Sequence, residues 1–145
     1  MSDLEKAVEI AIQAHKGQFD KSGEPYILHP MRLASKFENT DLKIVALLHD
    51  VVEDSNFSLD DLSGFGFSEN IVDAVDCLTK RANEDYERFI VRASRNKYAI
   101  KVKIEDLKDN MNICRLKQEL SDKDLQRISK YHKAYLILSK LDKEL

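Results

Sequence analysis

The sequence predicts an all-α fold, a single-domain helical bundle of about eight helices that spans residues 1–145. Apolar residues recur at the 3.6-residue helical period throughout the chain, whereas the alternating pattern of a strand is nearly absent. Only four glycines and two prolines interrupt the 145 residues, and no linker between domains is evident. A chain of this length can bury one sizeable core.

Composition and charge narrow the classes of function. The chain is 43% hydrophobic and 34% charged, which is ordinary for a globular protein, and its net charge of −3 argues against nucleic-acid binding as its main task. No apolar run approaches the ~20 residues of a membrane span, and the N-terminus has no signal-peptide core. We therefore expect neither nucleic acid nor membrane as a partner. Cys77 and Cys114 lie on apolar helical stripes, which predicts two buried, reduced thiols and a cytoplasmic location.

The first two predicted helices flank a loop. Residues 3–16 form the first helix, and His15 on its apolar face is interpreted as a packing or helix-end residue. Residues 17–25 form a turn-rich loop. Pro30 fits the first position of the second helix, which leaves His29 near the N-cap, at the mouth of a helix. That position suits a ligand better than a packing residue.

The third predicted helix, residues 41–53, carries polar side chains in an apolar setting. His49, Asp50, Glu53 and Asp54 lie in or beside a run that is apolar on nearly all sides. Burial of an unpaired polar group costs about 2–7 kcal/mol, and burial of a charge costs more. In one continuous helix His49 and Asp50 point about 100° apart, so both can reach a cation at the helix edge. The alternative is a His-Asp pair that only forms hydrogen bonds.

The rest of the chain predicts five more helices. They begin near residues 58 and 68 and then span residues 83–94, 98–116 and 121–145. The helix over residues 98–116 carries Lys103, Asp106 and Asn110 in one polar stripe. Such a stripe usually faces solvent, but the other sides of this helix are mostly apolar, so we expect it to face an internal polar site. The last helix closes the bundle.

Three segments, in this order, resemble the hydrolase domain of the RelA/SpoT family, which belongs to the HD superfamily of metal-dependent phosphohydrolases. They read Gly17-Gln18-x-x-Lys21-Ser22-Gly23-Glu24-Pro25-Tyr26-Ile27-x-His29-Pro30, His49-Asp50-Val51-Val52-Glu53-Asp54 and Val102-Lys103-Ile104-x-Asp106-x-x-x-Asn110-Met111. Leu78-Thr79-Lys80 adds a weaker match. The resemblance covers roughly residues 5–116 and implies a helical bundle of the HD type. Since no synthetase portion follows, it also implies a stand-alone small alarmone hydrolase.

The resemblance implies a divalent metal, Mn(II), held by four side chains. The matching positions are His29, His49, Asp50 and Asp106, so the helices that carry them must converge. Two imidazoles and two carboxylates form a mixed N/O set, which is compatible with Mn, Fe, Co or Zn. A metal in such a site lowers the pKa of a water and neutralises phosphoryl charge.

The implied reaction is removal of the 3′-pyrophosphate from guanosine tetra- or pentaphosphate, which gives GDP or GTP. Glu53 and Asp54 match the pair regarded as catalytic in the family, and a carboxylate there can orient or deprotonate water. The alternative for this pair is to support the metal ligands. Lys21, Lys103 and Asn110 are candidates for phosphate and ribose contacts, because an ammonium supplies a mobile charge and an amide both a donor and an acceptor.

Two motifs depart from the usual family pattern. Asp20 stands where the family usually has Arg, and the third motif has Leu107 and Asp109 where Arg and His are usual. These changes add negative charge around a site that would receive a polyanion. Two other functions therefore stay open, namely an HD phosphohydrolase for another nucleotide or phosphoester, and a non-catalytic module that binds a nucleotide or a metal.

Overall fold

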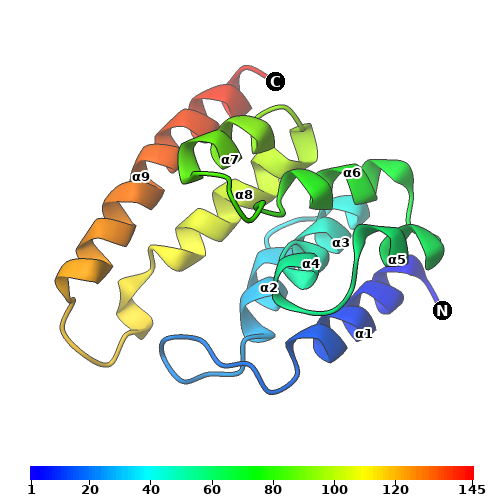
Figure 1. The fold of residues 1–145 in the computed structure, drawn as a ribbon, viewed down its shortest axis with the longest axis horizontal. Helices are drawn as coiled ribbons and strands as arrows, with labels where there is room; N and C mark the ends of the chain where they lie inside the picture. Colours follow the sequence, from blue (N-terminus) through cyan, green and yellow to red (C-terminus); the bar gives the residue numbers. More distant parts are fainter.

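The computed structural model describes residues 1–145 and contains nine α-helices and one short 3-10 helix (Figure 1). The helices are α1 Asp3–His15, α2 Leu28–Ala34, α3 Thr40–Leu48, α4 Val51–Asp54, α5 Leu59–Gly64, α6 Glu69–Cys77, α7 Tyr86–Ala93, α8 Lys97–Asn110, η1 Ile113–Arg115 and α9 Asp122–Lys143. The only strand-like pairing is one bridge between Phe19 and Pro25. The all-α prediction is confirmed.

Most helices begin at a side chain that caps the free backbone N–H groups of the first turn. Ser2, Ser58 and Ser121 each accept a bond from the third helical residue and form complete capping boxes. Further caps come from Asn39, Ser68, Asp85 and Asn96. These local signals explain why the starts near residues 3, 58, 68 and 121 agree with the prediction.

The predicted continuous helix over residues 41–53 is wrong. Helix α3 ends at Leu48, His49 is its C-cap, and the chain changes direction at Asp50, whose backbone has φ −104° and ψ 0°. Helix α4 then starts at Val51. No Gly or Pro marks this break, so the apolar periodicity runs through it without a signal.

Three other helix boundaries differ from the prediction by two, three and six residues. Helix α2 begins at Leu28, so His29 and Pro30 lie inside its first turn rather than at its N-cap. Proline is tolerated there because the first N–H groups of a helix have no partner within the helix. Helix α7 starts later than predicted, at Tyr86, and α8 ends at Asn110 rather than at residue 116.

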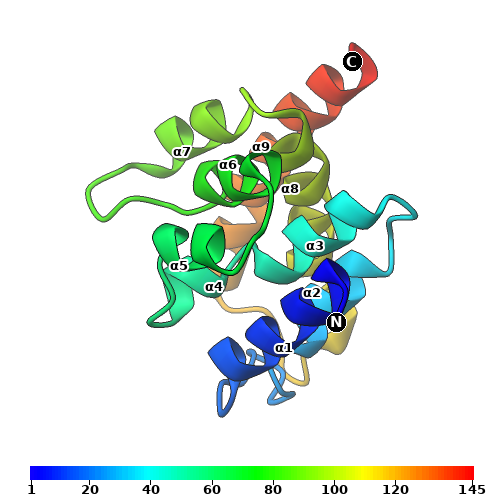
Figure 2. The ribbon, with the colours of Figure 1, turned by 90° about the vertical axis from the view of Figure 1, so that its right-hand side faces the viewer.

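The hydrophobic core has two parts that share helix α8. The larger cluster gathers buried side chains of α1, α2, α3, α4, α5 and α6 together with Ala99 and Val102 of α8. The smaller cluster joins α7 and α9 to Ile100 and Leu107 of the same helix. Figures 1 and 2 show α9 running beside α8 on one side of the molecule, with α1 and α5 on the other. Helix α8 therefore connects the two clusters.

The cysteines are less buried than the sequence indicated. Cys77 is half-buried and Cys114 is exposed, and neither forms a disulfide. The prediction of two buried thiols is wrong for Cys114 because α8 ends before it, which places Cys114 in the short η1 turn. None of the helices combines the length and the apolar character needed to traverse a lipid bilayer.

Candidate functional site

Four side chains that are far apart in the sequence meet at one buried point. His29, His49, Asp50 and Asp106 each offer one donor atom, and these atoms all lie within 4.8 Å of one another. Asp106 Oδ1 is 2.8 Å from His29 Nε2 and 3.4 Å from His49 Nε2, and His49 Nε2 is 3.0 Å from Asp50 Oδ2. The structure thus brings together the four predicted metal ligands, from α2, the α3–α4 junction and α8.

The break between α3 and α4 lies at the cluster itself. His49 is the C-cap of α3 and Asp50 is the N-cap of α4. The Asp50 carboxylate lies 3.0 Å from the imidazole of His49, so both face the same point. Tyr26 holds the carboxylate there, because its hydroxyl donates a hydrogen bond of 2.5 Å to Asp50 Oδ2.

The hydrogen bonds of the two imidazoles fix which nitrogen faces the cluster. His49 Nδ1 lies 2.6 Å from the carbonyl oxygen of Ala46, and His29 Nδ1 lies 2.6 Å from Asp109 Oδ2. Both partners can only accept, so both Nδ1 atoms carry the proton and both Nε2 atoms are directed at the cluster. His49 Nε2 is buried and has no hydrogen-bond partner. A cation between these donors would satisfy it, so the residues fit a divalent metal.

The charges of the cluster depend strongly on one another. Burial alone would lower the pKa of His49, but Asp50 and Asp106 outweigh burial and raise it well above its usual value. Burial alone would raise the pKa of Asp50, yet the neighbouring His49 lowers it to about 2. The site therefore favours ionised carboxylates around a concentrated positive charge, which either protonated imidazoles or a divalent cation can supply.

Two of the predicted substrate contacts also touch Asp106. Lys103 Nζ lies 2.7 Å from Asp106 Oδ2 and 5.1 Å from the centre of the Phe89 ring, and Asn110 Nδ2 lies 3.1 Å from Asp106 Oδ1. Burial would lower the pKa of Lys103, but the charge of Asp106 raises it, so the ammonium persists. Both side chains line a cavity of about 290 Å³ that opens beside the cluster.

The predicted catalytic pair borders the same cavity. Glu53 and Asp54 line it together with Asp50 and Asp106. Glu53 Oε1 accepts a hydrogen bond of 2.9 Å from the backbone N–H of Lys80. Partial burial, followed by the charges of Asp50 and Glu53, raises the pKa of Asp54 to about 6. A carboxylate with such a pKa is a good proton acceptor near neutral pH.

We expect Asp54→Asn to raise the melting temperature of the metal-free protein at pH 7.5 and to leave it unchanged at pH 4. The folded pKa of Asp54 lies above that of the unfolded chain, so ionisation of Asp54 destabilises the fold as pH rises from about 4 to about 6. The amide cannot ionise and avoids this loss. Thermal unfolding in chelator at both pH values measures the effect, with Asp73→Asn on the exposed side of α6 as a control. Equal melting temperatures at pH 7.5 would contradict the prediction.

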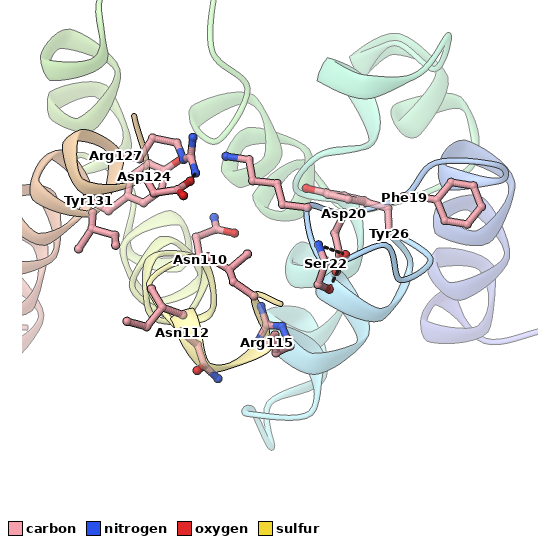
Figure 3. Close-up of a pocket in the computed structure, with 14 residues that line it drawn as sticks. Phe19, Asp20, Ser22, Tyr26, Asn110, Asn112, Arg115, Asp124, Arg127 and Tyr131 are labelled. Carbon is pink, nitrogen blue, oxygen red and sulfur yellow. Dashed lines mark hydrogen bonds and ion pairs between the residues drawn. The ribbon is translucent and has the colours of Figure 1, made fainter. Parts of the chain in front are cut away.

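A second cavity, of about 350 Å³, adjoins the first (Figure 3). Tyr26, Asn110 and Tyr131 line both cavities, so the two lie side by side and together make up a cleft of two cavities. Figure 3 shows the loop with Asp20 and Ser22 on one side of the cavity and α9 on the other. The cavity also takes in the cationic side chains Lys21, Arg115 and Arg127 and the aromatic side chains Phe19, Tyr26 and Tyr131. Two carboxylates, Asp20 and Asp124, line it as well, so the lining combines charges of both signs with aromatic rings.

No protein-family model matches the chain. Among curated proteins, it is 37% identical over 116 residues to a guanosine-3′,5′-bis(diphosphate) 3′-pyrophosphohydrolase of Haemophilus influenzae, which covers 70% of this chain and 17% of that protein. It is 45% identical over 80 residues to the protein of the same name from Borreliella burgdorferi, which covers 52% of this chain and 12% of that protein. The chain belongs to the RelA/SpoT family.

Other relatives of this RelA/SpoT chain extend the comparison. It is 29% identical over 137 residues to a GTP pyrophosphokinase of Streptomyces coelicolor, which covers 85% of this chain and 16% of that protein. The chain thus spans less than a fifth of the length of these curated relatives. Its fold matches the solved structure of a metazoan ortholog of SpoT, described as hydrolysing ppGpp, with a TM-score of 0.77, 19% identity and coverage of 99% and 96% of the two chains. The fold is therefore of the all-α HD type.

Asp20 and Asp109, which depart from the usual RelA/SpoT pattern, both have hydrogen-bond partners within the chain. Asp20 Oδ1 accepts hydrogen bonds from the backbone N–H and the hydroxyl of Ser22 and from the backbone N–H of Glu24, at 2.7–3.0 Å. Asp109 bonds to His29 and forms ion pairs with Arg32 and Arg115. The negative charge expected near the site is thus neutralised at Asp109, while at Asp20 it stabilises the loop.

Several contacts of the site were not predicted from the sequence. The sequence assigns no role to Tyr26, and it does not predict the hydrogen bond from His29 Nδ1 to Asp109, although the i+3 spacing of Asp109 from Asp106 puts both on one face of the helix. The interpretation of His15 as a packing residue agrees with the structure, where its Nδ1 lies 2.9 Å from Gln18 Oε1. Gln18 in turn donates to the carbonyl oxygen of Asp54, which ties the loop to α4.

Proposed function

We propose that this chain is a metal-dependent phosphohydrolase that removes the 3′-pyrophosphate of guanosine tetra- or pentaphosphate and yields GDP or GTP. The observation that carries the proposal is the set of four clustered donors, three of them buried, beside a cleft lined by charged and aromatic side chains. Curated relatives that share this part of the sequence carry that activity in their names. The cytoplasm is the proposed compartment, since both cysteines are unpaired.

Mn(II) is the proposed cation, held by His29, His49, Asp50 and Asp106. Imidazole and carboxylate donors in equal number suit a first-row divalent metal of intermediate hardness. When bound, the cation supplies Lewis acidity, which lowers the pKa of water and neutralises charge on a phosphoryl group. Tyr26 keeps the Asp50 carboxylate in place, and the Ala46 carbonyl oxygen keeps the His49 ring in place.

Asp54 is the proposed general base. Release of pyrophosphate requires that a water oxygen attack the phosphorus next to the ribose 3′ oxygen, which then leaves and takes up a proton. Asp54 borders the cavity, and its pKa of about 6 leaves it ionised at neutral pH yet basic enough to accept the proton of the water. Glu53, fixed by the N–H of Lys80, orients that water. Lys103 supplies positive charge in the same cavity.

The adjoining 350 Å³ cavity is the proposed nucleotide site. Lys21 places a cationic group there for phosphates, and Arg127, paired with Asp124, borders the same space. The rings of Tyr26 and Tyr131 offer apolar faces to a base or ribose. Asn110 lines both cavities, so its amide can reach a ribose hydroxyl between the two phosphate groups. The proposed contacts of Lys21, Lys103 and Asn110 thus lie along one cleft.

A hydrolysis screen with Mn(II) tests this function. Purified protein is offered guanosine tetraphosphate, guanosine pentaphosphate, GTP, ATP, a nucleoside monophosphate and para-nitrophenyl phosphate, and pyrophosphate and phosphate are measured separately. We expect the two alarmones to give the highest kcat/KM and to release pyrophosphate. Faster turnover of another substrate would favour the second candidate, a phosphohydrolase of different specificity, which Asp20 in place of the usual Arg favours. No turnover of any substrate would favour a binding module.

A further inference from the structure

Asp109 lies next to the proposed metal site and contacts three side chains, although the sequence motifs assign it no role. Its Oδ2 lies 2.6 Å from His29 Nδ1. Arg32, on α2, donates two hydrogen bonds of 2.9 Å to the same carboxylate. One runs from Nε to Oδ1 and the other from Nη2 to Oδ2. Arg115 approaches Oδ1 at 3.3 Å and also donates to the backbone oxygen of Asp109 at 3.1 Å. Asp109 is therefore held between three cationic or proton-donating partners.

These contacts determine how His29 presents its other nitrogen. An imidazole that donates through Nδ1 to a carboxylate has a fixed tautomer and a fixed ring plane, and its Nε2 is a stronger electron donor. For His29 that Nε2 is the atom within 2.8 Å of Asp106 Oδ1, among the four proposed ligand atoms. Because the Arg32 fork spans α2 and α8, it also sets the distance between the helices that carry His29 and Asp106.

The residue type at this position matters for the same reason. The usual RelA/SpoT pattern has His where this chain has Asp109, and a neutral imidazole cannot form the two-pronged ion pair with Arg32. A carboxylate can accept from the imidazole and from the guanidinium at the same time, since its two oxygens have about four acceptor positions. In this chain Asp109 therefore serves His29, Arg32 and Arg115 at once.

We propose that Asp109 is the positioning residue for the metal ligand His29, and that Arg32 and Arg115 hold Asp109 in that role. The inference rests on the proposed metal site but not on the identity of the substrate. Asp109 itself lines neither of the two cavities of the cleft, so it acts through His29. Its contribution is to metal affinity and to the geometry of one ligand.

The test is the dissociation constant for Mn²⁺, measured by calorimetry on the metal-free protein, together with thermal unfolding in chelator. Loss of a carboxylate behind a metal-binding histidine typically costs about 10–100-fold in metal affinity. We expect Asp109→Ala to reach that range, and Asp109→Asn to lose about tenfold, since its amide oxygen keeps the hydrogen bond but not the charge. Lys108→Ala, which removes an exposed neighbour on α8, is the matched control and should bind Mn²⁺ like the wild type.

The outcomes separate this inference from the proposed function. If Asp109→Asn unfolds at a lower temperature but binds Mn²⁺ with wild-type affinity, Asp109 only joins α2 to α8 and the inference is wrong. Should Asp109→Ala fail to fold, Asp109→Asn and Arg32→Lys carry the test, and Arg32→Lys should weaken Mn²⁺ binding because it breaks the fork. If the wild-type protein binds no Mn²⁺, the metal site fails and the inference fails with it. Wild-type binding without alarmone hydrolysis would overturn only the proposed function.

Discussion

Replacement of Asp106 by alanine is expected to abolish Mn²⁺ binding and to remove any effect of chelators on stability. Asp106 contacts both imidazoles of the donor cluster and is the only donor from α8, so without it a cation could not join α8 to α2 and to the α3–α4 junction. A ligand that binds only the folded state raises the melting temperature by mass action. Wild-type protein should therefore unfold at a higher temperature with Mn²⁺ than in chelator, whereas Asp106→Ala should show no difference.

The same variant should be less stable than the wild type even without metal. Lys103 is largely buried, and its ammonium is paired with Asp106 at 2.7 Å. Removal of one partner of a buried ion pair typically costs about 3–5 kcal/mol, because the other charge is left without compensation. Lys103→Met combined with Asp106→Ala should recover part of that loss. Metal analysis that finds equal Mn content in wild type and Asp106→Ala would overturn the ligand assignment.

The second large effect is expected from Asp54→Asn, which should lower kcat while it leaves Mn²⁺ affinity unchanged. Asp54 is not among the four clustered donors, and loss of a general base typically costs about 10²–10⁴-fold in rate. Glu53→Gln should reduce kcat less, because its amide oxygen can still accept the hydrogen bond from Lys80. Single-turnover hydrolysis and Mn²⁺ calorimetry measure the two quantities separately. Near-wild-type turnover of Asp54→Asn would show that the proposed base is wrong.

The residues of the site were easier to predict from sequence than the geometry that joins them. Polar groups in an apolar run predict a cation site at His49 and Asp50, and the polar stripe of the helix that carries Asp106 predicts an internal polar site there. The break after Leu48 was not predictable, because no Gly or Pro precedes it and the periodicity continues through it. Tyr26, the hydrogen-bond partner of Asp50, lies 24 residues earlier in the chain, and local sequence patterns carry no information at that range.

The roles of Asp109 and Asp20 were not predicted, because their hydrogen-bond partners could not be identified from the sequence. Asp109 looked like added negative charge because Arg32, 77 residues earlier in the chain, could not be placed next to it. Asp20 looked like a charge facing the substrate, but its partners are the backbone and side chain of its own loop. The helix starts near residues 3, 58, 68 and 121 were predictable because capping is local, whereas the end of α8 at Asn110 depends on the turn that follows.

The two cavities of the cleft are lined by largely different residues, and only one of them borders the clustered donors. The 350 Å³ cavity is lined by the loop before α2, the end of α8 and the first half of α9, and none of its lining residues is one of the four clustered donors (Figure 3). Substitutions at most of these residues would reshape the proposed nucleotide site and leave the four donors in place. Tyr26, Asn110 and Arg115 are the exceptions, because they contact Asp50, Asp106 and Asp109. Directed evolution for a new substrate should therefore begin with the other lining residues of this cavity.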